Sequence, residues 1–267
     1  MVTSGAPARG PAEAALVITC EHGGNRIPHA YRALFAGQCA LLASHRGFDP
    51  GALEMAEDLA LAFAAPLVAS TVSRLLVDLN RSIGNPALHA AQVRRLSNEQ
   101  REDILARYYR PFRSRAEQAV RRTIAENGAV LHLSSHSFTP ELDGKTRRAD
   151  IGLLYDPRRP GESELCRHWQ AALAGAAPHL TVRRNYPYAG KGDGLTRWLR
   201  QRLPADTYAG VELEVNQRHV LEAGPHWPAL RQILVTTLRH ALSQAQTGLP
   251  AARAAPHHPT IPRGSPP

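Results

Sequence analysis

Short apolar runs alternate with segments of helical periodicity along most of this chain, and this alternation constrains the fold more than any other feature. Apolar runs bounded by turn residues are typical of strands, and amphipathic segments between them are typical of helices. Strands that alternate with helices usually form a parallel sheet covered on both faces. We therefore predict an α/β fold with a mostly parallel central sheet covered by helices.

The limits of the expected elements follow from the same patterns. Ser97 and Gln100 form a capping-box pattern at the start of one helix, and Asn127-Gly128 is a typical C-terminal signal. Strands are predicted at 15–20, 65–71, 75–80, 129–135, 149–156, 181–185 and 208–216, and helices at 53–64, 97–127, about 162–175, 195–203 and 228–244.

Length and composition indicate one globular domain. The chain has 267 residues, 43% of them hydrophobic, which suits a single large α/β domain. Residues 1–13 are rich in Ala, Gly, Pro and Ser, and residues 247–267 are rich in Pro and Ala without periodicity. We predict a single folded domain at 14–246 between two disordered tails.

Charge and cysteine content restrict the class of protein. A formal charge of +9 raises the question of nucleic-acid binding, but no basic stripe is interleaved with stacking aromatics. Nucleic acid is thus an unlikely partner, and a small anionic substrate suits the charge equally well. No run of 18 apolar residues occurs, so no membrane span is predicted. Three cysteines without a CxxC pair disfavour a disulfide framework and indicate a cytoplasmic protein.

Reactive side chains lie near the ends of four predicted strands. In open α/β sheets the functional site lies at the carboxyl ends of the strands. The pattern therefore predicts an active site at one edge of the sheet. The residues are Glu21 and His22 after 15–20, Asn80 and Arg81 at the end of 75–80, His136 after 129–135, and Glu212, Glu214, Asn216 and Arg218 in and after 208–216.

His22 and His136 are candidate metal ligands. Zinc favours imidazole, and a catalytic zinc site needs about three protein ligands. Each histidine also has a structural interpretation. His22 can be a polar residue of a glycine-rich turn, and His136 can form local hydrogen bonds among serines.

Asp49 is our choice of third ligand. Asp49 followed by Pro50 at a helix start is also a typical N-cap, so capping is the alternative. Glu21 and His45 are rivals for the same role. Glu21 is disfavoured because adjacent residues on an extended chain point to opposite sides.

Glu214 is the candidate general base. Glu212 and Glu214 are two residues apart, so on a strand they face the same side. A carboxylate beside a zinc-bound water can accept its proton and return it to a leaving amine. The alternative is a salt bridge between one of the two and a nearby arginine.

The segment SRLLVDLNRS offers groups for a substrate carboxylate. Arg74 and Arg81 can each clamp a carboxylate in bidentate fashion, although Arg74 and Asp78 can also form a structural pair. Arg147 and Arg148 can bind anions or form a solvated loop. Residues 185–194, rich in Gly and Tyr, can face the substrate or serve only as a connection, and they carry no P-loop pattern.

Other hydrolase signatures are missing. Neither GxSxG nor HExxH occurs in the chain. A Cys–His nucleophile built on Cys20 is disfavoured, because a thiol at the end of a buried strand is usually inert.

Seven segments taken together resemble the N-formylglutamate amidohydrolase family and cover about residues 15–245. The resemblance implies a zinc carboxypeptidase-like fold, with three layers (α/β/α) around a mostly parallel, mixed central sheet, and one zinc ion per chain. In chain order the segments are VITCEHGGNRIP, SHRGFDPGALEMAEDLA, SRLLVDLNRS, SSHSFTP, RRADIGLLYDP, NYPYAGKGDG and GVELEVNQR.

The resemblance also implies roles for single residues. His22, Asp49 and His136 would be the zinc ligands, and Glu214 would be the general base. Arg74 would polarise the scissile carbonyl or assist with the substrate carboxylate. The residues expected to bind substrate are Asn80, Arg81, Arg148, Tyr186 and Arg218.

The expected activity is zinc-dependent hydrolysis of N-formyl-L-glutamate to formate and L-glutamate. Histidine-pathway members of the family more often read PHxG where this chain has Cys20-Glu21-His22-Gly23, so another N-acyl amino acid or a short peptide is the alternative substrate. A non-catalytic protein that binds anions or nucleic acid is the alternative of another class. The presence of every expected type of metal ligand disfavours it.

Overall fold

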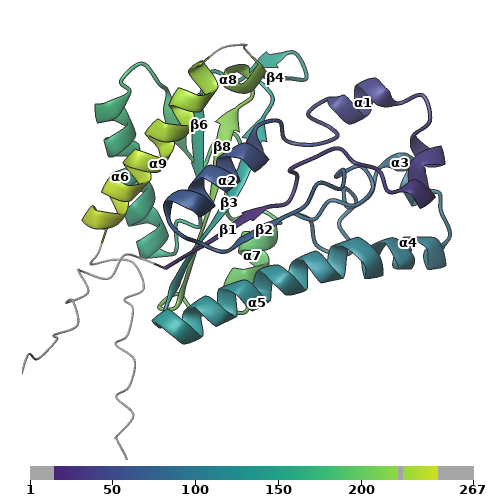
Figure 1. The fold of residues 1–267 in the computed structure, drawn as a ribbon, viewed down its shortest axis with the longest axis horizontal. Helices are drawn as coiled ribbons and strands as arrows, with labels where there is room; N and C mark the ends of the chain where they lie inside the picture. The colour runs from purple at the N-terminus through teal and green to yellow at the C-terminus, as the bar shows by residue number, and fades with distance from the viewer. Residues whose placement is uncertain (1–14, 222–224, 246–267) are drawn as a thin grey trace, which may run out of the picture.

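Six strands form a mixed central sheet with the order β2-β1-β3-β8-β6-β7. All neighbouring pairs are parallel except β6 and β8, which are antiparallel. The computed structural model describes residues 15–221 and 225–245 (Figure 1). The strands are β1 (Leu16–Cys20), β2 (Leu67–Ala69), β3 (Val130–Phe138), β6 (Ile151–Leu154), β7 (Val182–Arg184) and β8 (Tyr208–Asn216).

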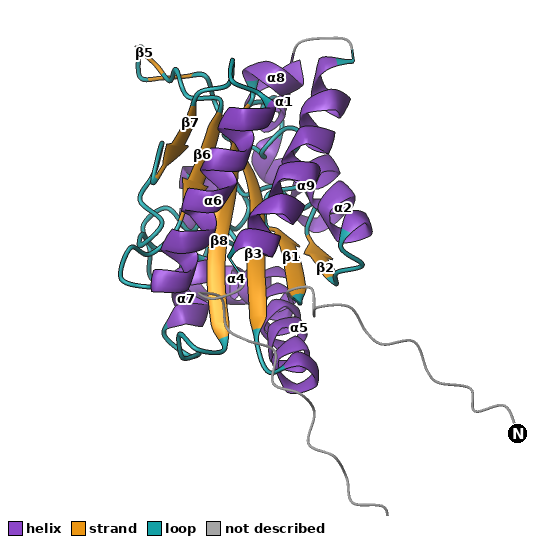
Figure 2. Cartoon of the chain, turned by 90° about the vertical axis from the view of Figure 1, so that its left-hand side faces the viewer, coloured by secondary structure: helices purple, strands orange, loops and turns teal. Residues whose placement is uncertain are grey.

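Helices cover both faces of this sheet, so the predicted three-layer α/β/α fold is confirmed. Side chains alternate along β1: Leu16 and Ile18 belong to one buried apolar cluster, and Val17 belongs to the other. Figure 2 shows α6 and α9 in front of the strands. The first cluster is covered by α2 (Ala52–Ala62), α6 (Pro160–Ala176) and α9 (His226–Gln244), and the second by α5 (Arg110–Asn127) and α7 (Leu195–Arg200).

The helix predicted at 97–127 is confirmed, with an interruption that the sequence does not reveal. Ser97 and Gln100 form the expected capping box, and Gly128 ends the helix with φ of 81°. Between α4 (Asn98–Ile104) and α5 the backbone makes one π-helical turn, η2 (Leu105–Tyr109). In Figure 1 the three segments run as one long helix along the lower edge.

The strand predicted at 75–80 is wrong. The backbone N–H of Asp78 donates to the carbonyl of Leu88 (2.8 Å), and Leu75 accepts from the N–H of Ala90 (3.1 Å), so this stretch pairs with a neighbouring loop outside the sheet. Its leucines and valine are buried in the same apolar cluster as α5. A short apolar run reports burial, and here burial belongs to an irregular segment.

Short elements and loops complete the chain. Among the described residues, no helix has the combination of length and apolar character that a membrane crossing needs. The predicted tails at 1–13 and 247–267 lie outside the described residues. The short elements are η1 (His29–Phe35), α1 (Cys39–Ala43), α3 (Ala91–Arg94), β4 (Glu141–Leu142), β5 (Lys145–Thr146) and α8 (Arg218–Leu221).

Candidate active site

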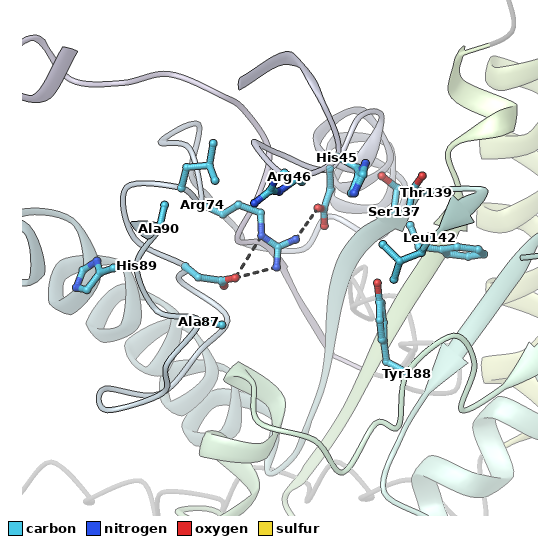
Figure 3. Close-up of a pocket in the computed structure, with 14 residues that line it drawn as sticks. His45, Arg46, Arg74, Ala87, His89, Ala90, Ser137, Thr139, Leu142 and Tyr188 are labelled. Carbon is cyan, nitrogen blue, oxygen red and sulfur yellow. Dashed lines mark hydrogen bonds and ion pairs between the residues drawn. The ribbon is translucent and has the colours of Figure 1, made fainter. Parts of the chain in front are cut away.

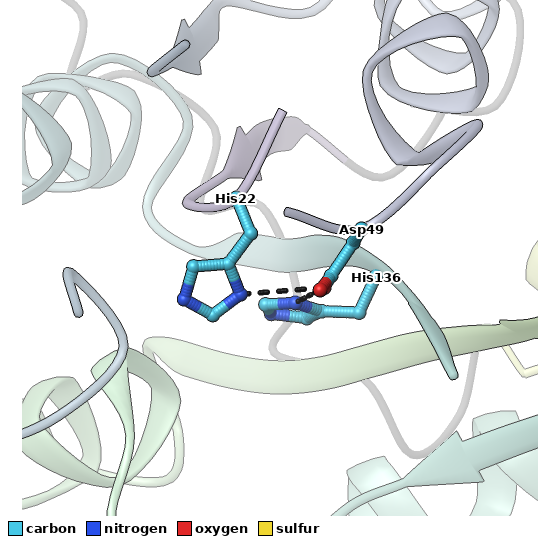
Figure 4. A group of neighbouring side chains, drawn as sticks. All are labelled: His22, Asp49 and His136. Atoms are coloured by element: carbon cyan, nitrogen blue, oxygen red, sulfur yellow. Dashed lines mark hydrogen bonds and ion pairs between the residues drawn. The ribbon is translucent and has the colours of Figure 1, made fainter. Parts of the chain in front are cut away.

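Three buried side chains from distant parts of the chain meet at one point. His22 follows β1, His136 lies within β3, and Asp49 precedes α2. The Nδ1 atoms of His22 and His136 lie 3.3 and 2.9 Å from Oδ2 of Asp49 (Figure 4). One ligand atom from each of the three residues lies within 4.8 Å of the others. Because β1 and β3 are neighbours in the sheet, both imidazoles reach the same edge.

The outward nitrogen of each imidazole contacts a buried carboxylate. Nε2 of His22 lies 2.8 Å from Oδ1 of Asp78, and Nε2 of His136 lies 3.1 Å from Oε2 of Glu21. Such partners fix the orientation of a metal-binding histidine and raise its basicity. They leave both Nδ1 atoms facing Asp49. Glu21, the rival third ligand, therefore contacts the side of His136 that faces away from Asp49.

Asp49 does not cap α2. The N-cap of α2 is Gly51, with φ of 79°, and no side chain caps this helix end. A Cβ on Gly51 would also lie 2.6 Å from Cγ2 of Val220, so a glycine is required there. The interpretation of Asp49 as only a helix cap is wrong, because its carboxylate instead contacts two histidines and Arg74.

The electrostatics of the cluster favour positive charge at its centre. Burial alone would raise the pKa of Asp49, but the charge of His22 and hydrogen bonds from both histidines hold this pKa well below its usual range. Burial opposes protonation of His136, yet hydrogen bonds to Asp49 and Glu21 hold its pKa well above the ordinary value. Two imidazoles and a carboxylate in such a field are a donor set suited to a divalent cation.

Arg74 bridges the two aspartates. Its Nη2 donates to Oδ2 of Asp78 (2.8 Å), and its Nη1 donates to Oδ1 of Asp49 (3.1 Å) (Figure 3). All three residues line a cavity of about 290 Å³. The aromatic rings of Phe138 and Tyr188 also line it, as does His45. The predicted action of Arg74 on a scissile carbonyl stays a prediction.

Glu214 is a buried carboxyl beside the cluster. It pairs with His136 across β8 and β3, so the two side chains leave the same face of the sheet. Its Oε2 is buried and has no hydrogen-bond partner among the described residues. Burial raises the pKa of Glu214 to about 8, and the charges of Asp49 and Glu212 add to the rise. Glu212 accepts a hydrogen bond from Oγ1 of Thr196 (2.5 Å).

Asn80 lies at the Nε2 side of His136, away from Asp49, and Arg81 follows it in the chain. Nδ2 of Asn80 is 3.4 Å from Nε2 of His136, and Oδ1 of Asn80 accepts from the N–H of Leu195 (2.6 Å). Nη1 of Arg81 donates to the carbonyl of Asp193 (2.7 Å). The Asn-Arg pair thus lies between the histidine cluster and the loop at 185–194.

The other predicted substrate contacts have different surroundings. Gly152 pairs with Glu214 across β6 and β8. A Cβ on Gly152 would lie only 2.0 Å from the carbonyl oxygen of Tyr186, so the backbone of Tyr186 lies close to the general-base candidate. Nε of Arg218 donates a hydrogen bond to Oδ1 of Asp150 (3.1 Å). The side chain of Arg148 is exposed. The described residues show no contact between either arginine and the histidine cluster.

Two acidic residues have functions that sequence reasoning missed. The sequence predicts Asp78 only as a partner of Arg74, although its Oδ1 also contacts Nε2 of His22. Asp193 accepts hydrogen bonds from the N–H of Ser82 (2.9 Å) and from Nδ2 of Asn85 (2.6 Å), which ties the 185–194 loop to the segment after Arg81. No local pattern marks Asp193, since its partners are more than 100 residues away in the chain.

Comparison with known proteins agrees with this arrangement. The family model described as N-formylglutamate amidohydrolase matches residues 14–221. The structure of gene product Atu2144 from Agrobacterium tumefaciens is similar, with a TM-score of 0.75 and 31% sequence identity over 87% of this chain and 92% of that chain. The N-formylglutamate amidohydrolase from Ralstonia eutropha has a TM-score of 0.67 and 20% identity over 90% of this chain and 97% of that chain. A search of curated proteins finds no match. The chain therefore belongs to the N-formylglutamate amidohydrolase family and is a hydrolase that acts on amide bonds.

Proposed function

We propose that this protein is a zinc-dependent amidohydrolase that converts N-formyl-L-glutamate and water to formate and L-glutamate. The observation that carries the proposal is the convergence of two imidazole Nδ1 atoms and one carboxylate beside Glu214, whose Oε2 is buried without a partner in the part of the chain that the structure describes. Family membership supports the amide bond as the bond that is cleaved.

His22, Asp49 and His136 would hold the zinc. Two histidines and one carboxylate are a known ligand set of catalytic zinc, and the outer carboxylates Asp78 and Glu21 supply the second layer that such sites need. When bound there, zinc lowers the pKa of a coordinated water and polarises a carbonyl.

Glu214 would move the proton. It accepts a proton as water adds to the formyl carbon, and it delivers that proton to the amide nitrogen as the C–N bond breaks. Its Oε2 is buried and has no hydrogen-bond partner among the described residues, so this oxygen is available to take up and release the proton. Its position on β8, beside His136 on β3, supports this role.

Basic and amide side chains would orient the anionic substrate. Asn80 and Arg81 would bind one carboxylate, and Arg74 would act on the scissile carbonyl. Arg74 uses three of its five N–H groups on Asp49 and Asp78, so one N–H on Nη1 and one on Nη2 remain for the substrate. Tyr186, Arg148 and Arg218 remain further predicted contacts. A cavity of about 290 Å³ suits an amino-acid-sized ligand.

A cytoplasmic location is part of the same proposal. Its support is that all three cysteines are free. Free thiols persist in the reducing cytoplasm.

The test joins metal analysis to product analysis. The full chain, purified without chelators, should carry one zinc per chain and release formate from N-formyl-L-glutamate in a chelator-sensitive way. His136→Ala should lose both, whereas the control His240→Ala, on the exposed side of α9, should keep both. Retention of zinc and activity by His136→Ala would disprove this ligand set.

The same preparation separates the alternatives. Zinc without formate release would leave the hydrolase and redirect the substrate search to other N-acyl amino acids and short peptides. A chain without metal that stays inactive after zinc addition would refute the catalytic proposal and favour an anion-binding protein.

A further inference from the structure

We propose that Tyr109 and Arg113 are positioning residues that hold Arg81 in place for a substrate carboxylate. This inference rests on the proposed function of Arg81. Neither residue belongs to the segments that resemble the family, and neither contacts the histidine cluster among the described residues.

The carbonyl of Arg81 accepts two hydrogen bonds from one helix. Oη of Tyr109 donates to it at 2.8 Å, and Nη2 of Arg113 donates to it at 3.0 Å. Tyr109 ends η2, and Arg113 lies in the first turn of α5. Two donors on one carbonyl restrict the direction of that peptide group, and therefore the starting direction of the Arg81 side chain.

Arg113 is itself held rigidly. Its guanidinium carbon lies 5.2 Å from the centre of the Tyr109 ring and 5.4 Å from the Trp198 ring, and the residue is only 4% exposed. Its Nε and Nη1 are buried without an acceptor among the described residues. A buried charge of this kind needs its remaining hydrogen bond, so the bond to the Arg81 carbonyl is a strong constraint.

The π-helical turn explains why these two side chains face Arg81. Residues four apart on a helix lie on the same face, so Tyr109 and Arg113 act together. A π turn adds one residue and rotates the helix that follows by about 100° relative to the helix before it. The capping box at Ser97 fixes α4, and the turn then sets the face of α5 that meets Arg81.

The guanidinium end of Arg81 is fixed separately. Nη1 donates to the carbonyl of Asp193 (2.7 Å), and Asp193 is bound to the N–H of Ser82, the next residue in the chain. Nε and Nη2 of Arg81 have no acceptor among the described residues. These two atoms form the side of a guanidinium that binds a carboxylate in bidentate fashion. Arg81 is thus anchored at both ends with one edge left for a ligand.

Steady-state kinetics of the zinc-loaded enzyme test the inference. Tyr109→Phe removes one hydroxyl and keeps the ring. We expect it to raise KM for N-formyl-L-glutamate about 3–10-fold, with kcat within about two-fold, because loss of one hydrogen bond loosens ground-state binding. Adding Arg113→Met should raise KM further. The control is Tyr108→Phe, the same change at the neighbouring residue, whose ring packs against Tyr31.

Substrate analogues give a readout that a merely structural effect would not move. The α- and γ-monoamides of N-formyl-L-glutamate each lack one carboxylate. In the wild type, the amide of the carboxylate bound by Arg81 should show a raised KM. In Tyr109→Phe the ratio of KM for amide to KM for acid should shrink, and the dissociation constant for L-glutamate, measured by calorimetry, should rise in parallel.

The outcomes distinguish this inference from the proposed function. If Arg81→Ala weakens L-glutamate binding but Tyr109→Phe and the double variant leave KM, the amide ratio and L-glutamate binding unchanged, the positioning role is refuted and the role of Arg81 stands. If Arg81→Ala itself has no effect on binding or on KM, both fail. L-glutamate binding needs no turnover, so the inference can be judged even if formate release is absent.

Discussion

Replacing Glu21 by Gln tests whether the outer carboxylate layer tunes the metal centre. Glu21 is fully buried, and its Oε2 lies 3.1 Å from Nε2 of His136 and 2.7 Å from Oγ of Ser134. The amide keeps the size and one acceptor but removes the charge. A charge-assisted hydrogen bond contributes about 1.5–3 kcal/mol and a neutral one about 1 kcal/mol. The difference is about 0.5–2 kcal/mol, which is roughly 2–30-fold in the dissociation constant of zinc.

Competition with a calibrated chelator measures this change directly. The control is Glu126→Gln, which removes the same charge from the exposed face of α5. Thermal unfolding of both variants checks that the fold is kept. If Glu21→Gln binds zinc as tightly as the wild type and the control, the argument that this carboxylate raises the basicity of His136 is refuted.

Three further predictions address the proton carrier, the second outer carboxylate and a buried histidine away from the cluster. Glu214→Gln should keep one zinc per chain while kcat for formate release falls about 10²–10⁴-fold; an unchanged kcat excludes Glu214 as the base. Asp78→Asn should weaken zinc binding by about 10–100-fold, measured by the same chelator competition, and equal affinity would show that His22 does not depend on it. His132 is buried between Thr19 and Tyr208, and burial lowers its pKa to about 4. Because the folded state favours the neutral imidazole, the stability that neutral His132 contributes is fully present above about pH 6.5 and is lost as the pH falls toward 4. Between pH 7 and pH 5, protonation linked to His132 should lower the free energy of unfolding by about 2 kcal/mol. Urea unfolding at pH 7 and pH 5 measures this drop, which should be about 2 kcal/mol smaller in His132→Gln than in the wild type. An equal drop in both proteins would show that His132 is not its source.

Sequence reasoning predicted that His22, Asp49 and His136 converge, because parallel strands gather distant residues at one edge. His22 follows an apolar strand and His136 lies near the end of another, so pairing the strands was enough to bring them together. The role of Asp49 could not be decided from the sequence alone, because an aspartate before a proline at a helix start is equally typical of a helix cap. Only the three-dimensional structure shows that Gly51 occupies the cap position and leaves the Asp49 carboxylate to the histidines.

The errors have a common physical origin. The segment at 75–80 is as apolar as a central strand because it is equally buried, and hydrophobic pattern carries no information about which backbone partners a buried segment finds. The π turn at Leu105–Tyr109 is likewise invisible in the sequence, because its residues are ordinary helix residues. Asp78 could be paired with Arg74 from local spacing, but its second partner, His22, is 56 residues away.

The single antiparallel pair in the sheet has an evolutionary consequence. Because β6 runs against β8, the chain between Phe138 and Ile151 stays at the edge where His136 and Glu214 lie, without returning through a crossover helix. This connection contains the β4–β5 hairpin, and Thr139 and Leu142 from it line the cavity beside Asp49. A surface hairpin tolerates insertion and exchange far better than a packed helix does. Divergence among relatives can therefore reshape the wall that meets the substrate, while the strands that carry the reactive groups keep their register.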